Sequence, residues 1–294
     1  MKKKELFKYM KIKKGEVPNT QFVSYPESVK VTMIDYPDKK RIKKVFVNFA
    51  TGSWFPNYSK NLSNKEINNE IKHLLSGNTL GQGIETAQFT FLIEGITLHD
   101  SHSLVRNRIG ISYMQQSQAV RDLRHDDILV PHSYSKYPKL LEEYKTWILY
   151  SKHLYSKLLD TDNISVNDAR LSLSKTIPVW IYFSCNLMTL ISLLEKRLDT
   201  QEESIGLNEM CKQIVILVTN KFKYLKPFLQ SACEKKKCFH QKKGFQANCI
   251  YTRDKQHEIK GYKDEFTLHN KTKTELSKGL KIKTEKYIGY KKQK

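Results

Sequence analysis

Residues 87–95, AQFTFLIEG, place apolar side chains at alternate positions, and this period of two strongly constrains the fold. Phe89, Phe91 and Ile93 share one face when the segment forms an extended strand. Residues 29–35, VKVTMID, alternate in the same way and predict a second strand. A strand with one apolar face must bury that face against another layer of structure. The chain therefore has to contain a sheet that other elements cover.

The covering elements are predicted to be helices. In residues 63–77, SNKEINNEIKHLLSG, Ser63 and Glu66 form a capping box at the start and Gly77 ends the helix. Together these patterns predict an α+β fold, in which an antiparallel or mixed sheet packs with helices. The other predicted elements are an apolar segment at 43–50, a polar helix after residue 95, a long amphipathic helix over 139–159, a short helix after a capped turn at Asn167 or Asp168, a buried apolar helix over 179–197 and a helix over 208–222.

Composition divides the 294 residues into three parts: a polar arm over 1–28, a folded domain over 29–232 and a lysine-rich extension over 233–294. The most apolar run, 179–194, is shorter than a membrane span and contains Asn186, so we expect no membrane association. The five cysteines form no CxxC pair and no signal peptide precedes the domain. Both features favour a reducing, cytoplasmic location.

The formal net charge of +21 allows two explanations. A chain rich in Lys, Asn and Ile but poor in Arg is what codon bias in an AT-rich genome produces, and such lysines need no ligand. The alternative is a polyanionic partner such as nucleic acid, bound through the lysine-rich extension with Tyr287 and Tyr290 interleaved. A solvated tail is the favoured interpretation, because the sequence shows no known nucleic-acid-binding motif.

Arginine is rare in this chain, and its positions are informative. Where Lys is the default cation, an Arg indicates a position that needs a planar fork with two parallel donors. Asn186 and Arg197 lie eleven residues apart, so on one helix they would share a face. Their partners are predicted to be either an internal carboxylate or an anionic ligand. Six of the eight arginines fall in one region: Arg106, Arg108, Arg121, Arg124, Arg170 and Arg197.

Residues 89–122, FTFLIEGITLHDSHSLVRNRIGISYMQQSQAVRD, closely resemble the central signature of the flavin-dependent thymidylate synthases, the ThyX family. Two later segments, DARLSL at 168–173 and NLMTLISLLEKR at 186–197, resemble further family segments. The resemblance covers about residues 30–218. It implies that the domain over 29–232 is a ThyX-like catalytic domain.

The resemblance also implies a reaction. Family members bind FAD and convert dUMP to dTMP by reductive methylation, with methylene-tetrahydrofolate and NADPH as co-substrates. The flavin carries the chemistry, no protein nucleophile attacks the pyrimidine, and no metal is needed. Members assemble as homotetramers whose active sites are built from several subunits. A protein with this role needs only to clamp and orient charged ligands.

Site residues follow from the resemblance position by position. Arg197 is expected to orient the pyrimidine, and Arg121 to replace a cation that the family carries where this chain has Ala119. Arg197 and Ser117 are the expected catalytic residues. The expected cofactor-binding residues are Arg106, Asn107, Arg108, Ser112, Gln115 and Asn186, and the expected dUMP-binding residues are Gln116, Ser117, Gln118, Arg121, Arg170 and Arg197.

The chain departs from the family pattern where the motif histidine is replaced by Asn107, whose amide donates hydrogen bonds but carries no proton. Three interpretations follow: a working thymidylate synthase, a flavin enzyme that modifies dUMP differently, for example by hydroxymethylation, or an inactive homologue that binds nucleotides or nucleic acid. The retained Arg170, Asn186 and Arg197 argue against the third.

Two other clusters contain side chains that are capable of chemistry. Cys233, Cys238, His240 and Cys249 have a loose spacing for a zinc site, and free thiols are the favoured interpretation. Residues 121–127, RDLRHDD, are predicted to form a solvated loop before Pro131, with folate or another subunit as alternative contacts.

Overall fold

The computed structural model describes residues 15, 18–38, 42, 63–75, 82–198, 204–232, 234 and 235. The chain divides into two compact units, Met1–Ser231 and Ala232–Lys294, and almost all described residues belong to the first. The apolar segment 43–50, Gly77, the candidate zinc ligands and nearly all of the lysine-rich extension lie outside the described residues.

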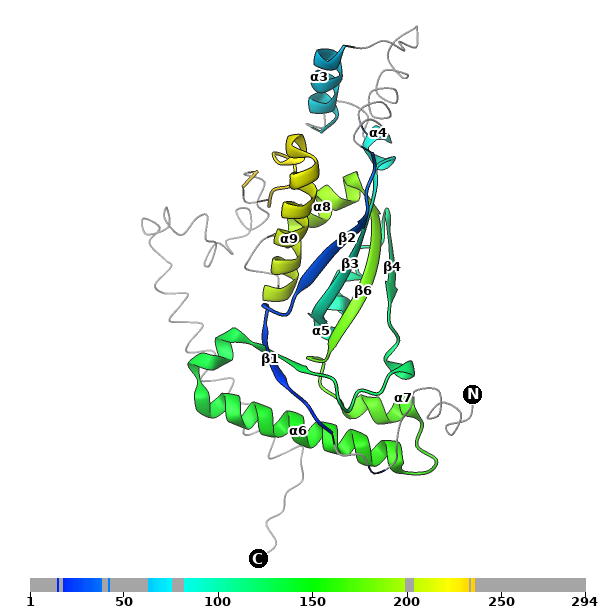
Figure 1. Ribbon diagram of the computed structural model, residues 1–294, viewed down its shortest axis with the longest axis vertical. Coiled ribbons are helices and arrows are strands. Elements are labelled where there is room, and N and C mark those ends of the chain that lie inside the picture. Colours follow the sequence, from blue (N-terminus) through cyan, green and yellow to red (C-terminus); the bar gives the residue numbers. More distant parts are fainter. Residues whose placement is uncertain are drawn as a thin grey trace, which may run out of the picture. The chain divides into compact units, whose positions relative to one another are not determined.

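A four-stranded antiparallel sheet forms the centre of the first unit (Figure 1). Its strand order is β2 (Lys30–Asp35), β3 (Gln88–Thr97), β6 (Pro178–Asn186) and β4 (Ile111–Gln115). Phe91 pairs with Phe183, and Tyr113 pairs with Phe183 from the other side. A second sheet joins β1 (Phe22–Tyr25) in parallel to β5 (Ile128–Pro131).

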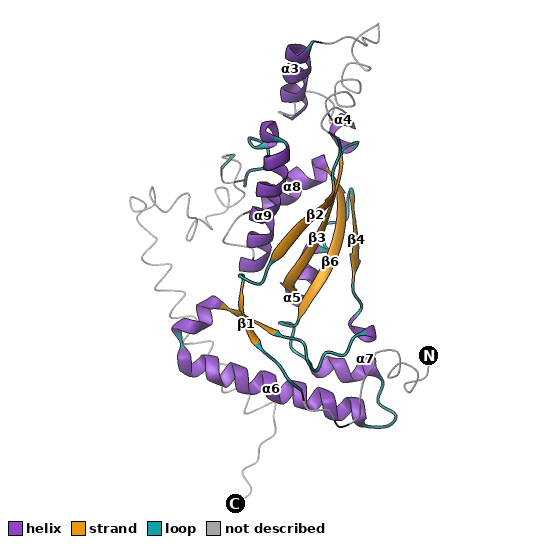
Figure 2. Cartoon of the chain, viewed as in Figure 1, coloured by secondary structure: helices purple, strands orange, loops and turns teal. Residues whose placement is uncertain are grey.

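One face of the four-stranded sheet carries the main core. Phe89, Phe91 and Ile93 are fully buried there, as the alternation predicts, and Ile181 and Phe183 extend the same face on the neighbouring strand. Helices α8 (Leu187–Arg197) and α9 (Ile205–Lys221) pack against this sheet along one side (Figure 2). The α+β prediction is confirmed, because the antiparallel sheet is covered by helices through one apolar face.

A second, smaller core lies beside the β1–β5 pair. Helix α6 (Pro138–Asp160) buries Ile148, Tyr155 and Leu159 in it. The short helix α7 (Val166–Ala169) and the 3-10 turn η3 (Arg170–Ser172) pack against α6. The long amphipathic helix predicted over 139–159 is confirmed almost residue for residue.

The predicted apolar helix over 179–197 is wrong in its first half. Residues 178–186 form the central strand β6, and the helix begins only at Leu187. The sequence VWIYFSC is rich in β-branched and aromatic residues, which favour a strand. This strand pairs with β3 on one side and β4 on the other, and its alternate side chains are buried in the core. The Asn186 side chain caps the helix by accepting a hydrogen bond of 2.8 Å from the Thr189 N–H. The chain therefore changes from strand to helix at Asn186.

Helix termini follow their capping residues. In α3 (Asn64–Leu75) the backbone N–H of Ser63 donates to Glu66 at 2.8 Å and the N–H of Glu66 donates back to the Ser63 hydroxyl at 3.4 Å, so the capping box is confirmed. Helix α7 is capped by Ser165 rather than by Asn167 or Asp168. Helix α9 begins three residues before the predicted start, because Ser204 caps it.

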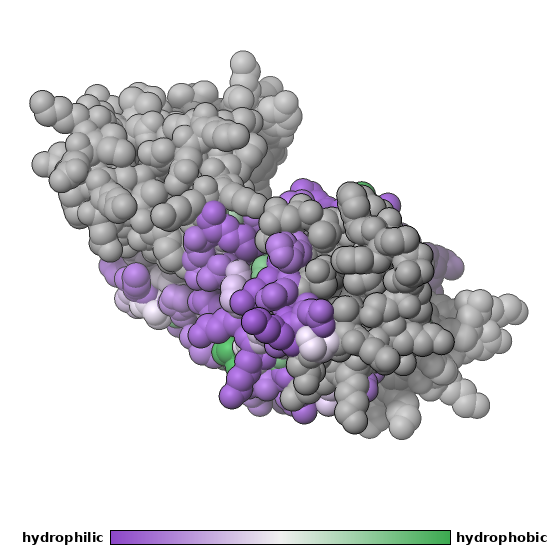
Figure 3. Space-filling model, turned by 90° about the horizontal axis from the view of Figure 1, so that it is seen from above, coloured by the Kyte–Doolittle hydropathy of each residue, from purple (hydrophilic) through white to green (hydrophobic). Residues whose placement is uncertain are grey.

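The remaining described elements are short. None of the described helices is long and apolar enough to cross a membrane. On the face seen from above, the visible described residues are mainly hydrophilic, with a few hydrophobic residues between them (Figure 3). The short elements are α4 (Gln82–Glu85), α5 (Leu98–Leu104), η1 (Gln118–Val120), η2 (His132–Lys136) and η4 (Lys223–Leu225).

Candidate functional site

Residues 105–110 follow directly after α5 and carry Arg106 and Arg108, and we call them the arginine segment. Side chains donate hydrogen bonds to the last carbonyls of α5. Arg197 Nη2 donates to the Ser103 carbonyl at 2.9 Å. Asn107 Nδ2 donates to the Leu104 carbonyl at 3.1 Å, and the Tyr113 hydroxyl donates to the same oxygen at 2.9 Å. Carbonyls at the end of a helix have no partner within the helix, so these three donors fix where α5 stops. The start of the arginine segment is thereby tied to the last residue of α8.

The other end of the segment is tied to the first turn of α8. Thr189 Oγ1 donates to the Ile109 carbonyl at 3.1 Å, and the Asn186 N–H donates to the Gly110 carbonyl at 3.2 Å. Gly110 has φ of +68°, and a Cβ there would collide with Thr189 Oγ1 and Asn186 Nδ2. Only glycine permits both this backbone conformation and this close approach. We call these contacts the Gly110 clamp, made by Ile109, Gly110, Asn186 and Thr189.

Arg106 and Arg108 lie between the two tethers and are both exposed, while Asn107 between them is half-buried and bonded to α5. Within the described part of the chain, no hydrogen bond or ion pair engages either guanidinium. The backbone of this segment is therefore held in place, and the N–H donors of both guanidinium groups remain available to a ligand. This geometry suits an anionic group such as a phosphate or pyrophosphate.

Asn186 and Arg197 do not share a helix face, contrary to the prediction. Asn186 precedes α8 as its cap, and Arg197 is the last residue of the helix. An eleven-residue helix separates the two by about 16 Å. The Asn186 N–H donates a hydrogen bond to the last residue of the arginine segment, and Arg197 donates one to the end of α5 directly before that segment. The length of α8 therefore sets the distance between the two ends of the arginine segment.

A second set of predicted residues lies on the turn after β4. Gln115 ends the strand, and Ser117 caps η1 by accepting a hydrogen bond of 3.2 Å from the Ala119 N–H. Gln118 Nε2 is buried and has no hydrogen-bond partner among the described residues. A buried donor without an acceptor is costly, so this amide is a candidate for contact with a ligand oxygen.

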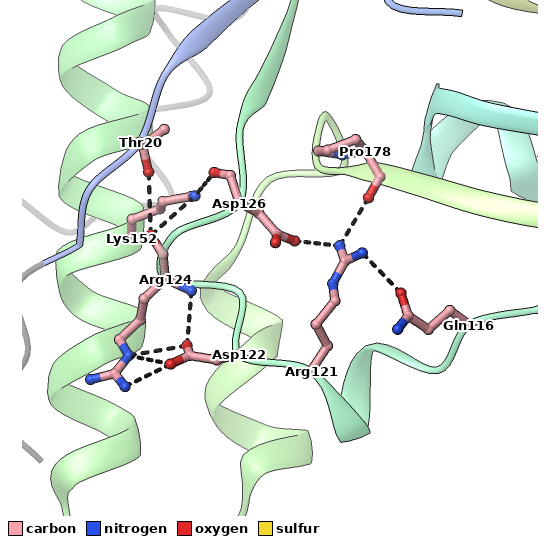
Figure 4. A network of polar contacts seen from close by, with 8 residues as sticks. All are labelled: Thr20, Gln116, Arg121, Asp122, Arg124, Asp126, Lys152 and Pro178. Atoms are coloured by element: carbon pink, nitrogen blue, oxygen red, sulfur yellow. Dashed lines mark hydrogen bonds and ion pairs between the residues drawn. The ribbon is translucent and has the colours of Figure 1, made fainter. Parts of the chain in front are cut away.

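Arg121 follows this turn in the sequence, and its guanidinium contacts Gln116 of the turn and two other parts of the chain (Figure 4). Its Nη1 donates to Gln116 Oε1 at 3.0 Å, and its Nη2 donates to the Pro178 carbonyl at 3.0 Å. The same Nη2 forms an ion pair with Asp126. The guanidinium thus links the turn to the start of β6 and to residues 121–127.

Residues 121–127 form a buried polar network, and the prediction of a solvated loop is wrong. The Arg124 side chain is fully buried and pairs with Asp122 at 2.6 Å. Lys152 reaches in from α6 and donates to the backbone carbonyls of Asp126 and, at 3.3 Å, of Arg124. Burial lowers the pKa of Lys152 to about 8, and burial raises the pKa of Asp126 despite the opposing charges of Arg121 and Lys152.

Two predicted residues lie apart from these contacts. Ser112 is exposed on β4 opposite Ser184. Arg170 begins η3 beside α6 and is half-buried. Among the described residues, no hydrogen bond or ion pair joins the Arg170 guanidinium to another predicted site residue. The structure therefore places Arg106 and Arg108 before β4, the turn with Gln116, Ser117 and Gln118 after β4, and Arg170 beside the smaller core.

The sequence interpretation missed three residues that position the site. Gly110 and Thr189 make the Gly110 clamp, and Lys152 anchors the 121–127 network. Thr189 had a usable signal, because it lies three residues after Asn186 and asparagine is a favoured N-cap residue. Lys152 had none, because a lysine in a lysine-rich amphipathic helix does not indicate burial.

Comparison with known proteins identifies relatives across most of the described region. The family model described as thymidylate synthase complementing protein, Thy1, matches residues 30–222. The flavin-dependent thymidylate synthase of Clostridium tetani is 28% identical over 221 residues, which is 68% of this chain and 87% of that protein. The flavin-dependent thymidylate synthase of Pyrococcus furiosus is 31% identical over 171 residues, 55% of this chain and 68% of that protein.

Solved structures agree on the fold. The UMP/dUMP methylase PolB from Streptomyces cacaoi, bound with 5-Br dUMP, superposes with a TM-score of 0.58 at 16% identity, over 71% of this chain and 94% of that one. The same methylase bound with 5-Br UMP gives a TM-score of 0.56. The resemblance seen in the sequence is confirmed: the chain belongs to the thymidylate synthase complementing protein family, the family of enzymes that includes the flavin-dependent thymidylate synthases.

Proposed function

We propose that this chain is a flavoprotein that converts dUMP to dTMP, with methylene-tetrahydrofolate as the one-carbon donor and NADPH as the reductant. Family membership and the names of its relatives support the reaction type. One structural observation carries the proposal: the exposed guanidiniums of Arg106 and Arg108 have no partner among the described residues, on a segment tied at both ends to α8. The assembly proposed with it is a homotetramer.

The residues of the arginine segment fit FAD. Arg106 and Arg108 would pair with its phosphates, because each offers a planar fork that matches phosphate oxygens. Ser112, Gln115 and Asn186 would supply neutral polar contacts, with Asn186 already fixed by its capping bond. When bound, the flavin supplies the hydride and one-carbon chemistry. Asn107 would act indirectly, because its amide donates to the Leu104 carbonyl at the end of α5.

The turn after β4 fits the nucleotide. Gln118 Nε2 is a buried donor that needs an acceptor, and the exposed Ser117 hydroxyl lies beside it in sequence. Neutral donors of this kind suit phosphate and carbonyl oxygens. Arg197 would orient the pyrimidine from the end of α8, and Arg170 would approach from the smaller core.

Asn107 limits the chemistry that this chain can perform at the position of the family's histidine. An amide can donate a hydrogen bond but cannot take up or release a proton at neutral pH. The proposed reaction therefore requires no proton transfer by this side chain. The alternative product, hydroxymethyl-dUMP, would keep the one-carbon unit at the oxidation level of methylene-tetrahydrofolate, because it would take up water instead of a hydride.

The test combines a spectrum with a product assay. The purified chain is reconstituted with FAD and titrated with dUMP, and the flavin absorbance bands should appear and shift. Incubation with dUMP, labelled methylene-tetrahydrofolate and NADPH should then yield labelled dTMP. Labelled hydroxymethyl-dUMP would establish the alternative reaction, and a chain that binds no FAD would contradict both.

Two controls sharpen this test. UMP in place of dUMP asks whether the ribose 2′-hydroxyl is tolerated, because the similar structures include a methylase bound with 5-Br UMP. Affinity for DNA at rising salt, with and without residues 233–294, examines the nucleic-acid alternative. Tight, salt-sensitive DNA binding together with no flavin binding would favour that alternative.

A further inference from the structure

The Arg121 side chain has an unusual set of partners for an arginine that is predicted to contact a nucleotide. Two of its nitrogens are used by Gln116, Pro178 and Asp126, all within the protein. The third, Nε, is buried and has no hydrogen-bond partner within the part of the chain that the structure describes. The side chain is about three-quarters buried, and its charge is offset by the Asp126 carboxylate, which is buried to a similar extent. The cation is therefore held inside the protein more than it is offered to a ligand.

The contact with Gln116 fixes which end of that amide faces Arg121. A guanidinium carries only donors, so the Gln116 atom 3.0 Å from Arg121 Nη1 must be the carbonyl oxygen Oε1. The amide nitrogen Nε2, with its two N–H bonds, then points away from Arg121. Without Arg121 the amide can rotate and present either a donor or an acceptor. With Arg121 it presents only donors.

Two groups outside the turn hold the Arg121 guanidinium in place. The Pro178 carbonyl belongs to the first residue of β6, and Asp126 lies in the 121–127 network. Lys152 of α6 in turn holds the Asp126 carbonyl (Figure 4). A side chain with so many fixed partners has little freedom to swing toward a ligand. It is suited to preorganising a neighbouring group, which lowers the cost of binding.

Gln116 is close in sequence to a second donor of the same kind. Two residues later, on the turn that Ser117 caps, Gln118 Nε2 is buried and finds no hydrogen-bond partner in the described ranges. Two amide donors on one short turn would recognise acceptor oxygens and would reject groups that are themselves donors. The turn is therefore built to recognise oxygen atoms without placing a free cation there.

We propose that Arg121 is a positioning residue for nucleotide recognition: it holds the Gln116 amide with Nε2 outward, so that this nitrogen donates to an acceptor oxygen of dUMP. This inference rests on the proposed function, because dUMP is the ligand. It differs from the prediction that Arg121 itself contacts the nucleotide. In that case the contact would have to be made by Nε or by exchange of one of the three internal partners.

A double-mutant cycle separates positioning from direct contact. The dUMP dissociation constant is measured by calorimetry on the FAD-reconstituted full chain for wild type, Arg121→Met, Gln116→Ala and the double variant. Positioning predicts that Arg121→Met weakens binding about 10-fold in the wild-type background and less than about 2-fold when Gln116 is already Ala. Equal losses in both backgrounds would show that Arg121 acts on the nucleotide directly and would overturn the proposal.

A second variant tests the outward donor. Gln116→Glu keeps an oxygen for Arg121 but removes the N–H bonds, so we expect dUMP affinity to fall about 10- to 100-fold with an unchanged unfolding temperature. Asn163→Asp makes the same chemical change in the exposed turn after α6 and should leave affinity unchanged. A Gln116→Glu variant that binds dUMP as tightly as wild type would overturn the proposal. Deoxyuridine, measured in parallel, shows whether the acceptor oxygen belongs to the phosphate or to the nucleoside.

Two further measurements keep the outcomes distinct. Arg121→Lys keeps a cation beside Asp126 but lacks the fork, and it replaces Arg121→Met in the cycle if the methionine variant does not fold. Wild-type binding is established first. A wild-type chain that binds FAD but no dUMP contradicts the proposed substrate and the positioning role together. A wild-type chain that binds dUMP with an additive cycle contradicts the positioning role alone.

Discussion

Arginines serve opposite purposes in two neighbouring regions of this chain. Arg106 and Arg108 are exposed on a tethered segment and have no partner among the described residues, whereas Arg121 and Arg124 are largely or fully buried and pair with carboxylates. The first pair is available to an anion, and the second pair holds the fold around it. The difference shows that the partners of an arginine, rather than its presence in a motif, indicate its role.

The largest expected effect is on FAD binding by the exposed pair. The double variant Arg106→Gln, Arg108→Gln should weaken FAD binding at least about 100-fold, because each charge-assisted bond to a phosphate contributes about 1.5–3 kcal/mol. The unfolding temperature should change little, since no protein partner is lost. Flavin absorbance titration and thermal unfolding measure the two quantities. Lys157→Gln, which removes an exposed charge on α6, is the matched control.

The buried pair should show the reverse pattern. Arg124→Met leaves the Asp122 carboxylate without its guanidinium partner and should lower the free energy of unfolding by about 3–5 kcal/mol. FAD affinity of the folded fraction should stay near that of wild type. Urea unfolding, followed by circular dichroism, measures the loss. A variant as stable as wild type would show that the ion pair is unimportant for the fold.

The Gly110 clamp connects fold and ligand, so its disruption should affect both. Gly110→Ala should lower the free energy of unfolding by about 1–3 kcal/mol and weaken FAD binding, because the new Cβ collides with Thr189 and Asn186. Gly15→Ala is a matched control: Gly15 has a similar φ of +73°, but none of the described residues places an atom within 4 Å of its added Cβ. If the two variants behave alike, backbone strain alone would explain the result and the clamp would have no separate role.

Lys152 should give stability a pH dependence that has no effect on ligand binding. Burial lowers its pKa in the folded chain from 10.5 to about 8. Between these values the unfolded chain binds a proton that the folded chain does not, so the free energy of unfolding rises with pH. From about pH 7 to about pH 9.5, wild type should gain about 2 kcal/mol relative to Lys152→Met.

Urea unfolding at the two pH values measures this difference. Lys157→Met removes an exposed lysine from the same helix and should show the wild-type pH dependence. A Lys152→Met variant whose stability follows that of wild type at both pH values would mean that Lys152 is not buried in the folded chain.

Local patterns predicted much of the fold. The period of two placed Phe89, Phe91 and Ile93 on the buried face, and the capping box placed the start of α3. The break at Asn186 was missed because a short apolar run has no period that separates a buried strand from a buried helix. Pairing with β3 and β4 determines that residues 178–186 form a strand, and such pairing joins residues far apart in the sequence.

The candidate site was only partly predictable for the same reason. The motif located Arg106, Arg108 and the turn after β4, because their spacing is local. The burial of Arg124 and the partners of Arg121 depend on Lys152 and Pro178, which lie 26 or more residues away from them. Sequence alone could therefore identify the arginines but could not separate the exposed pair from the buried pair.

The most direct test of this distinction is arginine-specific labelling of the flavin-free chain with phenylglyoxal, mapped by mass spectrometry with and without FAD. We expect Arg106 and Arg108 to react readily and to be protected by FAD, while Arg121 and Arg124 stay unmodified in both samples. Equal labelling of all four, or labelling of Arg106 and Arg108 that FAD does not reduce, would contradict the account.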